Sequence, residues 1–172
     1  PGFSSPEQEA VRFALFCGAI AAVTADTWAT EIGRFSRAAP RLITTGRVVT
    51  PGVSGGITPL GTGGSALGGA MIGILAAIGA SNGWIAGAVW PFLLGITIAG
   101  LAGSLADSLL GATLQAAYYC PQCQKRTERR VHTCGTPTTL IHGNAWITND
   151  VVNLAASLTG VAVGFAAWLL SR

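Results

Sequence analysis

The stretch from residue 84 to residue 111 reads WIAGAVWPFLLGITIAGLAGSLADSLLG. No charged side chain interrupts it between Trp84 and Ala106. A helix needs about 20 consecutive apolar residues to cross the hydrocarbon core of a bilayer. The stretch therefore predicts a membrane-spanning helix over residues 84–106, and a carboxylate, Asp107, follows it immediately.

Three further segments are long and apolar enough to span a membrane, at about residues 11–29, 62–80 and 151–170. Half of the 172 residues are hydrophobic and only 10% are charged, whereas soluble domains carry about a quarter charged residues. The sequence predicts an all-α integral membrane protein, with four transmembrane helices in a single membrane domain over residues 1–172.

The first ten residues, PGFSSPEQEA, contain neither an initiator methionine nor the pattern of a signal peptide. We therefore expect a fragment or a processed form, with further helices upstream.

The basic residues are concentrated in two connections, a glycine-rich loop over 33–61 and a cysteine-containing loop over 118–147. The positive-inside rule predicts that both are cytoplasmic and that the amino terminus lies outside. A prokaryotic plasma membrane is the expected location. The formal net charge of +3 is too small to indicate nucleic-acid binding. Orientation alone can explain these basic residues, or they can also handle phosphate; both interpretations stay open.

Acidic and polar side chains gather where three predicted helices meet this cytoplasmic face. An ionised side chain inside a span costs about 3 kcal/mol on insertion scales, so it usually faces a partner or a cavity. The third helix places Ser104, Asp107 and Ser108 on one stripe, by helical spacing. The candidate catalytic residues of all three helices are Asp26, Glu31, Asp107, Asp150 and Asn153.

Three of these candidates carry an open question. Asp150 can be an ordinary acidic residue in the first turn of a helix, where the helix dipole stabilises a negative charge. Asp26 and Glu31 lie about 140° apart on a straight helix, so both reach one site only if the helix ends or unwinds near Gly33.

Magnesium is the cation that these residues indicate. It prefers oxygen ligands and binds through one or two carboxylates together with substrate phosphates. Four carboxylates, Asp26, Glu31, Asp107 and Asp150, are expected to hold one or two such ions.

The connection LITTGRVVTPGVSGGITPLGTGGSALGG, residues 42–69, is rich in glycine and hydroxyl groups. Free backbone amides before a helix amino terminus form a binding site for anions. A Walker A sequence is absent. The expected phosphate-binding residues are Thr45, Arg47, Ser54, Gly55, Gly56, Thr58, Gly61 and Thr62. The glycines further along, from Gly64 to Gly73, are instead expected to let helices pack closely.

The sequence CPQCQKRTERRVHTCG, residues 120–135, has the spacing of a tetrahedral zinc site. Disulfides are rare in the cytoplasm, which also favours metal. The predicted ligands of this structural zinc are Cys120, Cys123, His132 and Cys134, with His142 as the alternative fourth ligand. Cys17, alone in the first helix, is expected to be a packing residue.

Four of these segments together resemble the phytyl-phosphate kinase family, which also contains uncharacterised multispanning membrane proteins of vertebrates, bacteria and archaea. They are ADTWATEIG (25–33), LITTGRVVTPGVSGGITPLGT (42–62), DSLLGATLQ (107–115) and NDVVN (149–153). Each motif is weak alone, but their order along the chain makes the set specific. More remotely, the pattern is similar to CTP-dependent polyprenol kinases and CDP-lipid synthases.

The resemblance implies transfer of a phosphoryl group from CTP or another nucleoside triphosphate to an isoprenoid monophosphate such as phytyl phosphate. The implied partners are the nucleotide, a prenyl-phosphate lipid and the membrane, and a homodimer could complete the lipid pocket. The family usually begins with further helices, and the cysteine loop is not general to it. The alternatives are a cytidylyltransferase that makes CDP-lipids and an ion or solute transporter.

Overall fold

The protein is described by a computed structural model, which covers residues 5–171. It contains four long helices: α1 (Pro6–Gly33), α2 (Pro59–Ser81), α3 (Val89–Thr113) and α4 (Asn149–Leu170). Each is long and apolar enough to cross a membrane. The prediction of a helical membrane protein is confirmed.

The helix limits differ from the predicted spans at two informative places. α3 begins at Val89 because the preceding turn contains Gly83 and Gly87, whose φ angles of 71° and 140° are incompatible with a helix. α1 runs without a break through Asp26 to Gly33. The first helix therefore does not unwind after Asp26, which fixes where its polar side chains point.

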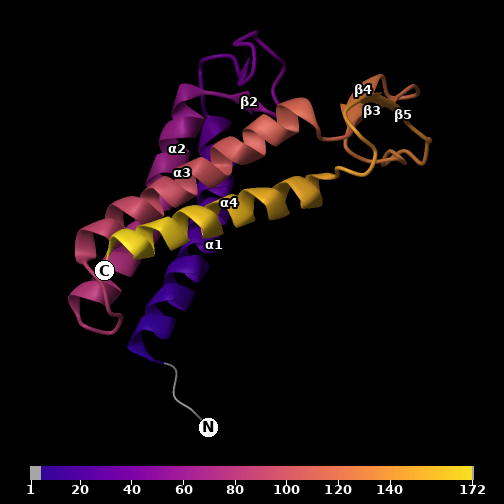
Figure 1. Ribbon diagram of the computed structural model, residues 1–172. Coiled ribbons are helices and arrows are strands. Elements are labelled where there is room, and N and C mark those ends of the chain that lie inside the picture. Colours follow the sequence, from indigo (N-terminus) through magenta and orange to yellow (C-terminus); the bar gives the residue numbers. More distant parts are fainter. Residues whose placement is uncertain (1–4, 172) are drawn as a thin grey trace.

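Both long connections lie at the same end of the helical bundle (Figure 1). The first contains a short antiparallel pair, β1 (Arg41–Leu42) with β2 (Gly56–Ile57). The second forms an antiparallel sheet in the order β4-β3-β5, from β3 (Ala117–Cys120), β4 (Lys125–Thr127) and β5 (Thr139–His142). The opposite end holds the short turn between α2 and α3, where the Ala88 N–H donates to the Ser171 carbonyl over 3.1 Å.

Small residues let the helices approach to backbone contact. A Cβ atom added to Gly18 of α1 would collide with the carbonyl oxygen of Gly160 in α4. One added to Gly69 of α2 would lie 2.8 Å from the Thr97 carbonyl oxygen in α3. Close approach of this kind is how membrane helices associate in lipid. The packing role predicted for the glycines of α2 is confirmed.

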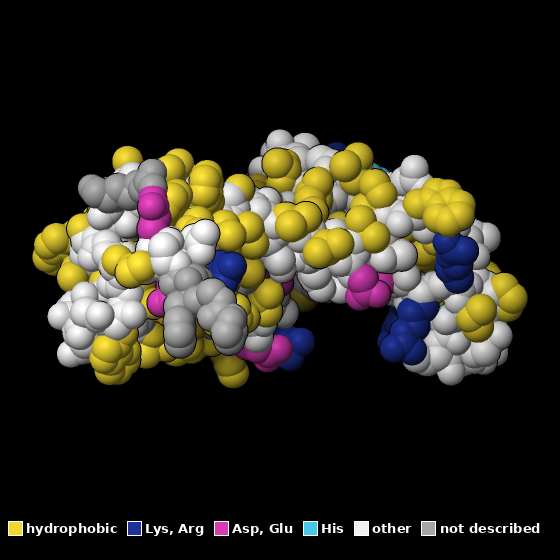
Figure 2. Space-filling model, turned by 60° about the horizontal axis from the view of Figure 1, so that its bottom comes forward, with side chains coloured by type: hydrophobic (Ala, Val, Ile, Leu, Met, Phe, Trp, Pro, Cys, Tyr) yellow, Lys and Arg dark blue, Asp and Glu magenta, His cyan; other side chains and the backbone are white. Residues whose placement is uncertain are grey.

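The outer surface of the bundle is apolar. Figure 2 shows hydrophobic side chains over much of the helical part of the face in view. Large exposed hydrophobic residues occur on every helix, among them Phe16, Leu67, Leu94 and Leu158. Exposed tryptophans lie towards both ends of the bundle: Trp84 and Trp90 at the short turn, and Trp146 just before α4.

Candidate functional site

A polar cavity of about 480 Å³ lies at the end of the bundle that carries the two long connections. The carboxyl ends of α1 and α3 meet the amino ends of α2 and α4 there, and the glycine-rich connection closes it. The predicted site residues that line this cavity are Asp26, Ser54, Gly55, Gly56, Thr58, Gly61, Thr62, Asp107 and Asn153.

Two carboxylates from different helices enter the cavity. The Ser104 hydroxyl of α3 donates to Oδ1 of Asp26 in α1 over 3.4 Å, and Asp107 follows Ser104 by about one helical turn. Among the described residues, two buried side-chain atoms lack a hydrogen-bond partner, Oδ2 of Asp107 and Oγ of Ser65. Both residues line this cavity. Because buried polar atoms are almost always paired, these two atoms mark where a polar ligand or cation fits.

Two helix amino termini border the same cavity. α2 begins after Thr58, whose side chain accepts a hydrogen bond from the Gly61 N–H over 3.0 Å. α4 contributes Asn149 and Asn153, one turn apart on one face. The positive ends of helix dipoles favour anions, so this arrangement is suited to phosphate as well as to a cation.

The glycine-rich connection has fewer free backbone amides than the sequence predicts. The Gly56 N–H donates to the Val53 carbonyl over 3.0 Å, and the Gly55 carbonyl accepts from the Ile43 N–H over 2.9 Å. The Gly56 and Gly61 amides are therefore bonded within the protein. The expectation of freely available amides at these two glycines is wrong, because the segment folds into the β1–β2 pair and the cap of α2.

Gly55 seats this connection against α3. Its φ angle is +78°, and a Cβ atom there would overlap Ala112 and lie 2.6 Å from the Ser108 carbonyl oxygen. Only glycine combines this conformation with this contact. The glycine is thus a spacer that brings Ser54 to the rim of the cavity.

Four predicted site residues lie outside the cavity: Glu31, Thr45, Arg47 and Asp150. Glu31 forms an exposed ion pair of 3.0 Å with Arg34, because the unbroken α1 turns it away from Asp26. Asp150 is exposed in the first turn of α4. This position agrees with the alternative that Asp150 is an ordinary acidic residue at a helix start. The Thr45 hydroxyl caps its own turn by accepting from the Arg47 N–H over 3.4 Å.

Several cavity residues are not predicted as site residues by the sequence, among them Arg34, Gln115 and Glu128. The Gln115 side-chain amide donates to Oε1 of Glu128 over 2.8 Å, and the Ser54 hydroxyl donates to the same oxygen over 3.1 Å. Glu128 lies in the cysteine loop, immediately after β4. Nothing in its local sequence, TERR, distinguishes it from a solvated charge.

The predicted magnesium site of four carboxylates is not assembled. Asp26 and Asp107 share the cavity, whereas Glu31 and Asp150 do not line it. Two carboxylates still fit magnesium, which commonly binds one or two together with substrate phosphates. The unpaired Oδ2 of Asp107 supplies the oxygen donor that such an ion needs.

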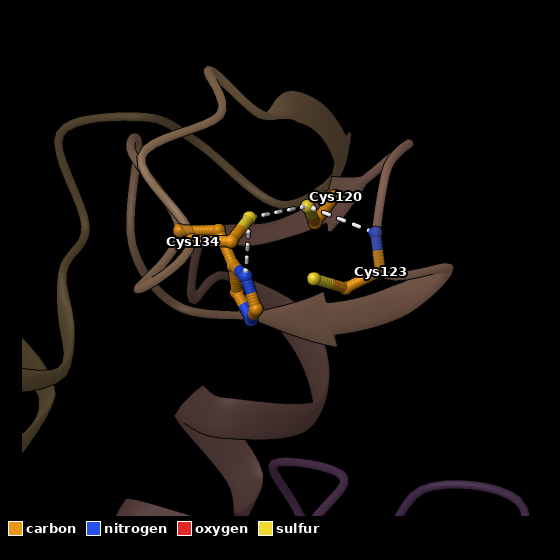
Figure 3. Close-up of side chains that lie close together, drawn as sticks. Cys120, Cys123 and Cys134 are labelled. Carbon is orange, nitrogen blue, oxygen red and sulfur yellow. Dashed lines mark hydrogen bonds between the residues drawn. The ribbon is translucent and has the colours of Figure 1, made fainter.

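A second cluster lies in the cysteine loop. The ligand atoms of Cys120, Cys123, His132 and Cys134 all lie within 4.8 Å of one another. It is the one group of three or more potential His, Cys, Asp or Glu ligands found in residues 5–171. Figure 3 shows the three thiol groups turned towards a common centre. Hydrogen bonds with Thr136 and His132 lower the pKa of Cys134 to about 5.

The comparisons with known proteins agree with this architecture. An uncharacterized membrane protein of Methanocaldococcus jannaschii is 41% identical over 100 residues, which are 58% of this chain and 39% of that protein. Protein PGR of Arabidopsis thaliana is 41% identical over 108 residues, which are 60% of this chain and 38% of that protein. The chain thus spans about two fifths of the length of these curated relatives.

These relatives come from an archaeon and a plant, so the comparison does not restrict the protein to a prokaryotic membrane. No solved structure matches the chain. Residues 3–161, nearly the whole sequence, match the family described as integral membrane protein DUF92, and the chain belongs to that family.

Proposed function

We propose that this protein is a membrane-embedded phosphotransferase that transfers the γ-phosphoryl group of CTP or another nucleoside triphosphate to an isoprenoid monophosphate. The observation that carries the proposal is the polar cavity at one end of an apolar bundle. It combines two carboxylates from separate helices, an unpaired carboxylate oxygen, hydroxyl groups and two helix amino termini. The motif resemblance to phytyl-phosphate kinases supports phytyl phosphate as the acceptor.

The dimensions of the site fit this class of substrate. A cavity of about 480 Å³ lies within the range of about 300–1,000 Å³ that is usual for small-molecule sites. A prenyl phosphate keeps its tail in lipid and its headgroup at the interface. The apolar helix surfaces and the polar bundle end match these two halves of one molecule.

The roles of the residues follow from their positions. Asp26 and Asp107 would hold a magnesium ion, which when bound neutralises charge on the transferring phosphoryl group. Ser104 orients Asp26 through its hydrogen bond. Arg34, Thr62 and the amino end of α2 would bind phosphate oxygens, because a guanidinium, a hydroxyl and a helix dipole all favour anions.

The proposed reaction does not need a strong general base. A non-bridging oxygen of the lipid monophosphate attacks the γ-phosphorus, and the bond from that phosphorus to the β–γ bridging oxygen breaks. The products are a lipid diphosphate and a nucleoside diphosphate. The attacking oxygen is already ionised, so the protein has to position and shield charge more than move a proton.

The position of the cavity favours an enzyme over a transporter. Transporters bind their cargo near the middle of the bilayer, between inverted repeats. Here the carboxylates lie at the bundle end that carries both basic connections. We propose that this end faces the cytoplasm, where nucleotides are available.

The test is an assay of the purified protein in detergent with magnesium, CTP and phytyl phosphate. Two labels separate the candidate reactions. A kinase moves γ-label into the lipid and leaves α-label in CDP, whereas a cytidylyltransferase moves α-label into the lipid. Ion flux in liposomes without turnover of any nucleotide would contradict both enzymes. ATP, GTP and UTP, together with prenyl alcohols as acceptors, define the specificity.

A further inference from the structure

We propose that Cys120, Cys123, His132 and Cys134 bind one zinc ion, and that this ion holds Glu128 as a clamp on the glycine-rich connection. The proposal has two parts, the metal and the clamp, and each stands on its own contacts. Neither depends on the reaction proposed above, so a failed phosphotransfer assay leaves both intact.

The distances suit a tetrahedral ion. Two thiolates bound at about 2.3 Å in a tetrahedron lie about 3.8 Å apart. The Sγ atoms of Cys120 and Cys134 are 3.7 Å apart. Nδ1 of His132 lies 3.1 Å from Sγ of Cys134. Three thiolates and one imidazole make a closed ligand set, which is typical of a structural and not a catalytic zinc.

The backbone turns around the cluster also favour metal binding. Between Cys120 and β4, Gln124 has a φ angle of 52°, and the Cys123 N–H donates to Sγ of Cys120 over 3.5 Å. A positive φ at a residue other than glycine is uncommon. A second tight turn, in which the Gly135 N–H donates to the His132 carbonyl over 2.8 Å, presents the other two ligands. All four ligand residues therefore sit at or beside tight turns.

The metal cluster and Glu128 lie at opposite ends of one hairpin. β3 and β4 pair from Cys120 opposite Lys125 to Tyr118 opposite Thr127. The cluster closes the tip of this hairpin, and Glu128 follows at its base, beside the end of α3. A zinc ion that fixes the tip therefore fixes the position of Glu128.

Glu128 joins three parts of the molecule. Its Oε1 atom accepts from Gln115 at the end of α3 and from Ser54 in the glycine-rich connection. Gln115 is 3% exposed, so this hydrogen bond satisfies a buried amide. A smaller cavity of about 220 Å³ adjoins the polar cavity. Ser54 and Glu128 line both cavities. The clamp thus sets the wall that the two cavities share.

The metal is tested by elemental analysis of the protein purified from zinc-supplemented medium under reducing conditions. We expect one zinc per chain in the wild type. Cys134→Ser and His132→Ala should lose it, whereas the matched controls Cys17→Ser and His142→Ala should keep it. Both ligands changed are on the loop, so circular dichroism should show unchanged helix content in Cys134→Ser and His132→Ala.

Cobalt substitution tests the ligand set without any variant. The chelated wild-type protein titrated with Co²⁺ should develop the visible bands of tetrahedral cobalt with thiolate charge transfer, saturating at one equivalent. Substoichiometric zinc together with no such spectrum would overturn the metal site. Zinc retained by His132→Ala but lost by His142→Ala would overturn the assignment of His132.

The clamp is tested by hydrogen exchange with mass spectrometry. We expect exchange in residues 50–57 to accelerate several-fold both after zinc removal and in Glu128→Ala, which should still contain zinc. Lys125→Ala, on the exposed strand of the same hairpin, is the matched control and should leave exchange unchanged. Unchanged exchange in both zinc-free protein and Glu128→Ala would overturn the clamp while leaving the metal assignment to its own test.

Discussion

The polar cavity and the Cys/His cluster are two different solutions to bringing ligands together. The cluster takes its four residues from one short loop, 120–134. The cavity takes Asp26, Ser65, Asp107 and Asn153 from four separate helices. The cluster therefore depends on two local turns, whereas the cavity exists only when the whole bundle is packed. A substitution that disturbs helix packing should therefore affect the cavity and leave the cluster intact.

The largest expected effect distinguishes acids inside the cavity from acids outside it. Asp107→Asn should lower kcat of the proposed transfer at least about 100-fold, because it weakens a proposed ligand of the magnesium ion whose charge would stabilise the transition state. Asp150→Asn should leave kcat within about threefold, as expected for an exposed side chain whose charge is screened by solvent. Steady-state rates measured on both proteins at matched helix content provide the comparison. Equal losses would show that our distinction between the two acids is wrong.

The second test breaks the bundle and spares the cluster. Gly160→Ala places a methyl group against the Gly18 carbonyl, and overpacking of this kind costs about 1–3 kcal/mol. The apparent free energy of unfolding in mixed detergent should fall by that amount, while the zinc content remains one per chain. Gly63→Ala is the control, since a Cβ atom there meets nothing within 4 Å. Zinc lost together with helix stability would mean that the two sites are not independent.

A third comparison tests how the glycine-rich connection contributes to the cavity. Gly55 and Gly46 both have positive φ angles, but a Cβ atom contacts α3 only at Gly55. Alanine costs about 1–2 kcal/mol at either position for conformation alone. Gly55→Ala should in addition raise the KM for nucleotide about tenfold, which corresponds to about 1.4 kcal/mol. If Gly46→Ala raised KM equally, seating against α3 would not matter.

The smallest expected effect concerns the exposed ion pair beside the cavity. Glu31→Gln removes the 3.0 Å contact to Arg34, and exposed pairs contribute at most about 1 kcal/mol. Thermal stability should hardly change, and KM for nucleotide should stay within about threefold. Arg34→Gln, which changes the member of the pair that lines the cavity, should raise KM more. The opposite order would place the functional charge on Glu31.

These contrasts explain which features the sequence could predict. The four residues of the Cys/His cluster are close in sequence, so their spacing alone predicts which ligand atoms the structure brings together, including those of His132 in preference to His142. The helices were evident because long apolar runs admit few other structures in a membrane. Asp26 and Asp107 were found because charge inside a span is costly and requires a reason.

The remaining site residues depended on information that is not local. Whether Glu31 shares the site of Asp26 was decided by the continuity of α1, and five residues along an unbroken helix turn a side chain by about 140°. Glu128 reaches the cavity only through the register of the β3–β4 hairpin. A carboxylate followed by two arginines in a loop gives no sign of such a position. The amides of Gly56 and Gly61 were bonded internally, a result of turn geometry that composition does not reveal.

The exposed tryptophans have a consequence for the depth of the molecule in its membrane. Indole rings settle at the boundary between lipid tails and water. Trp84 and Trp90 lie towards one end of the bundle and Trp146 towards the other, so we expect them to anchor at opposite boundaries and to fix the vertical position of the bundle in the bilayer. We expect this position to hold Asp26 and Asp107 near the level of the phospholipid headgroups, where the proposed lipid substrate would meet the carboxylates by lateral diffusion, without leaving the bilayer.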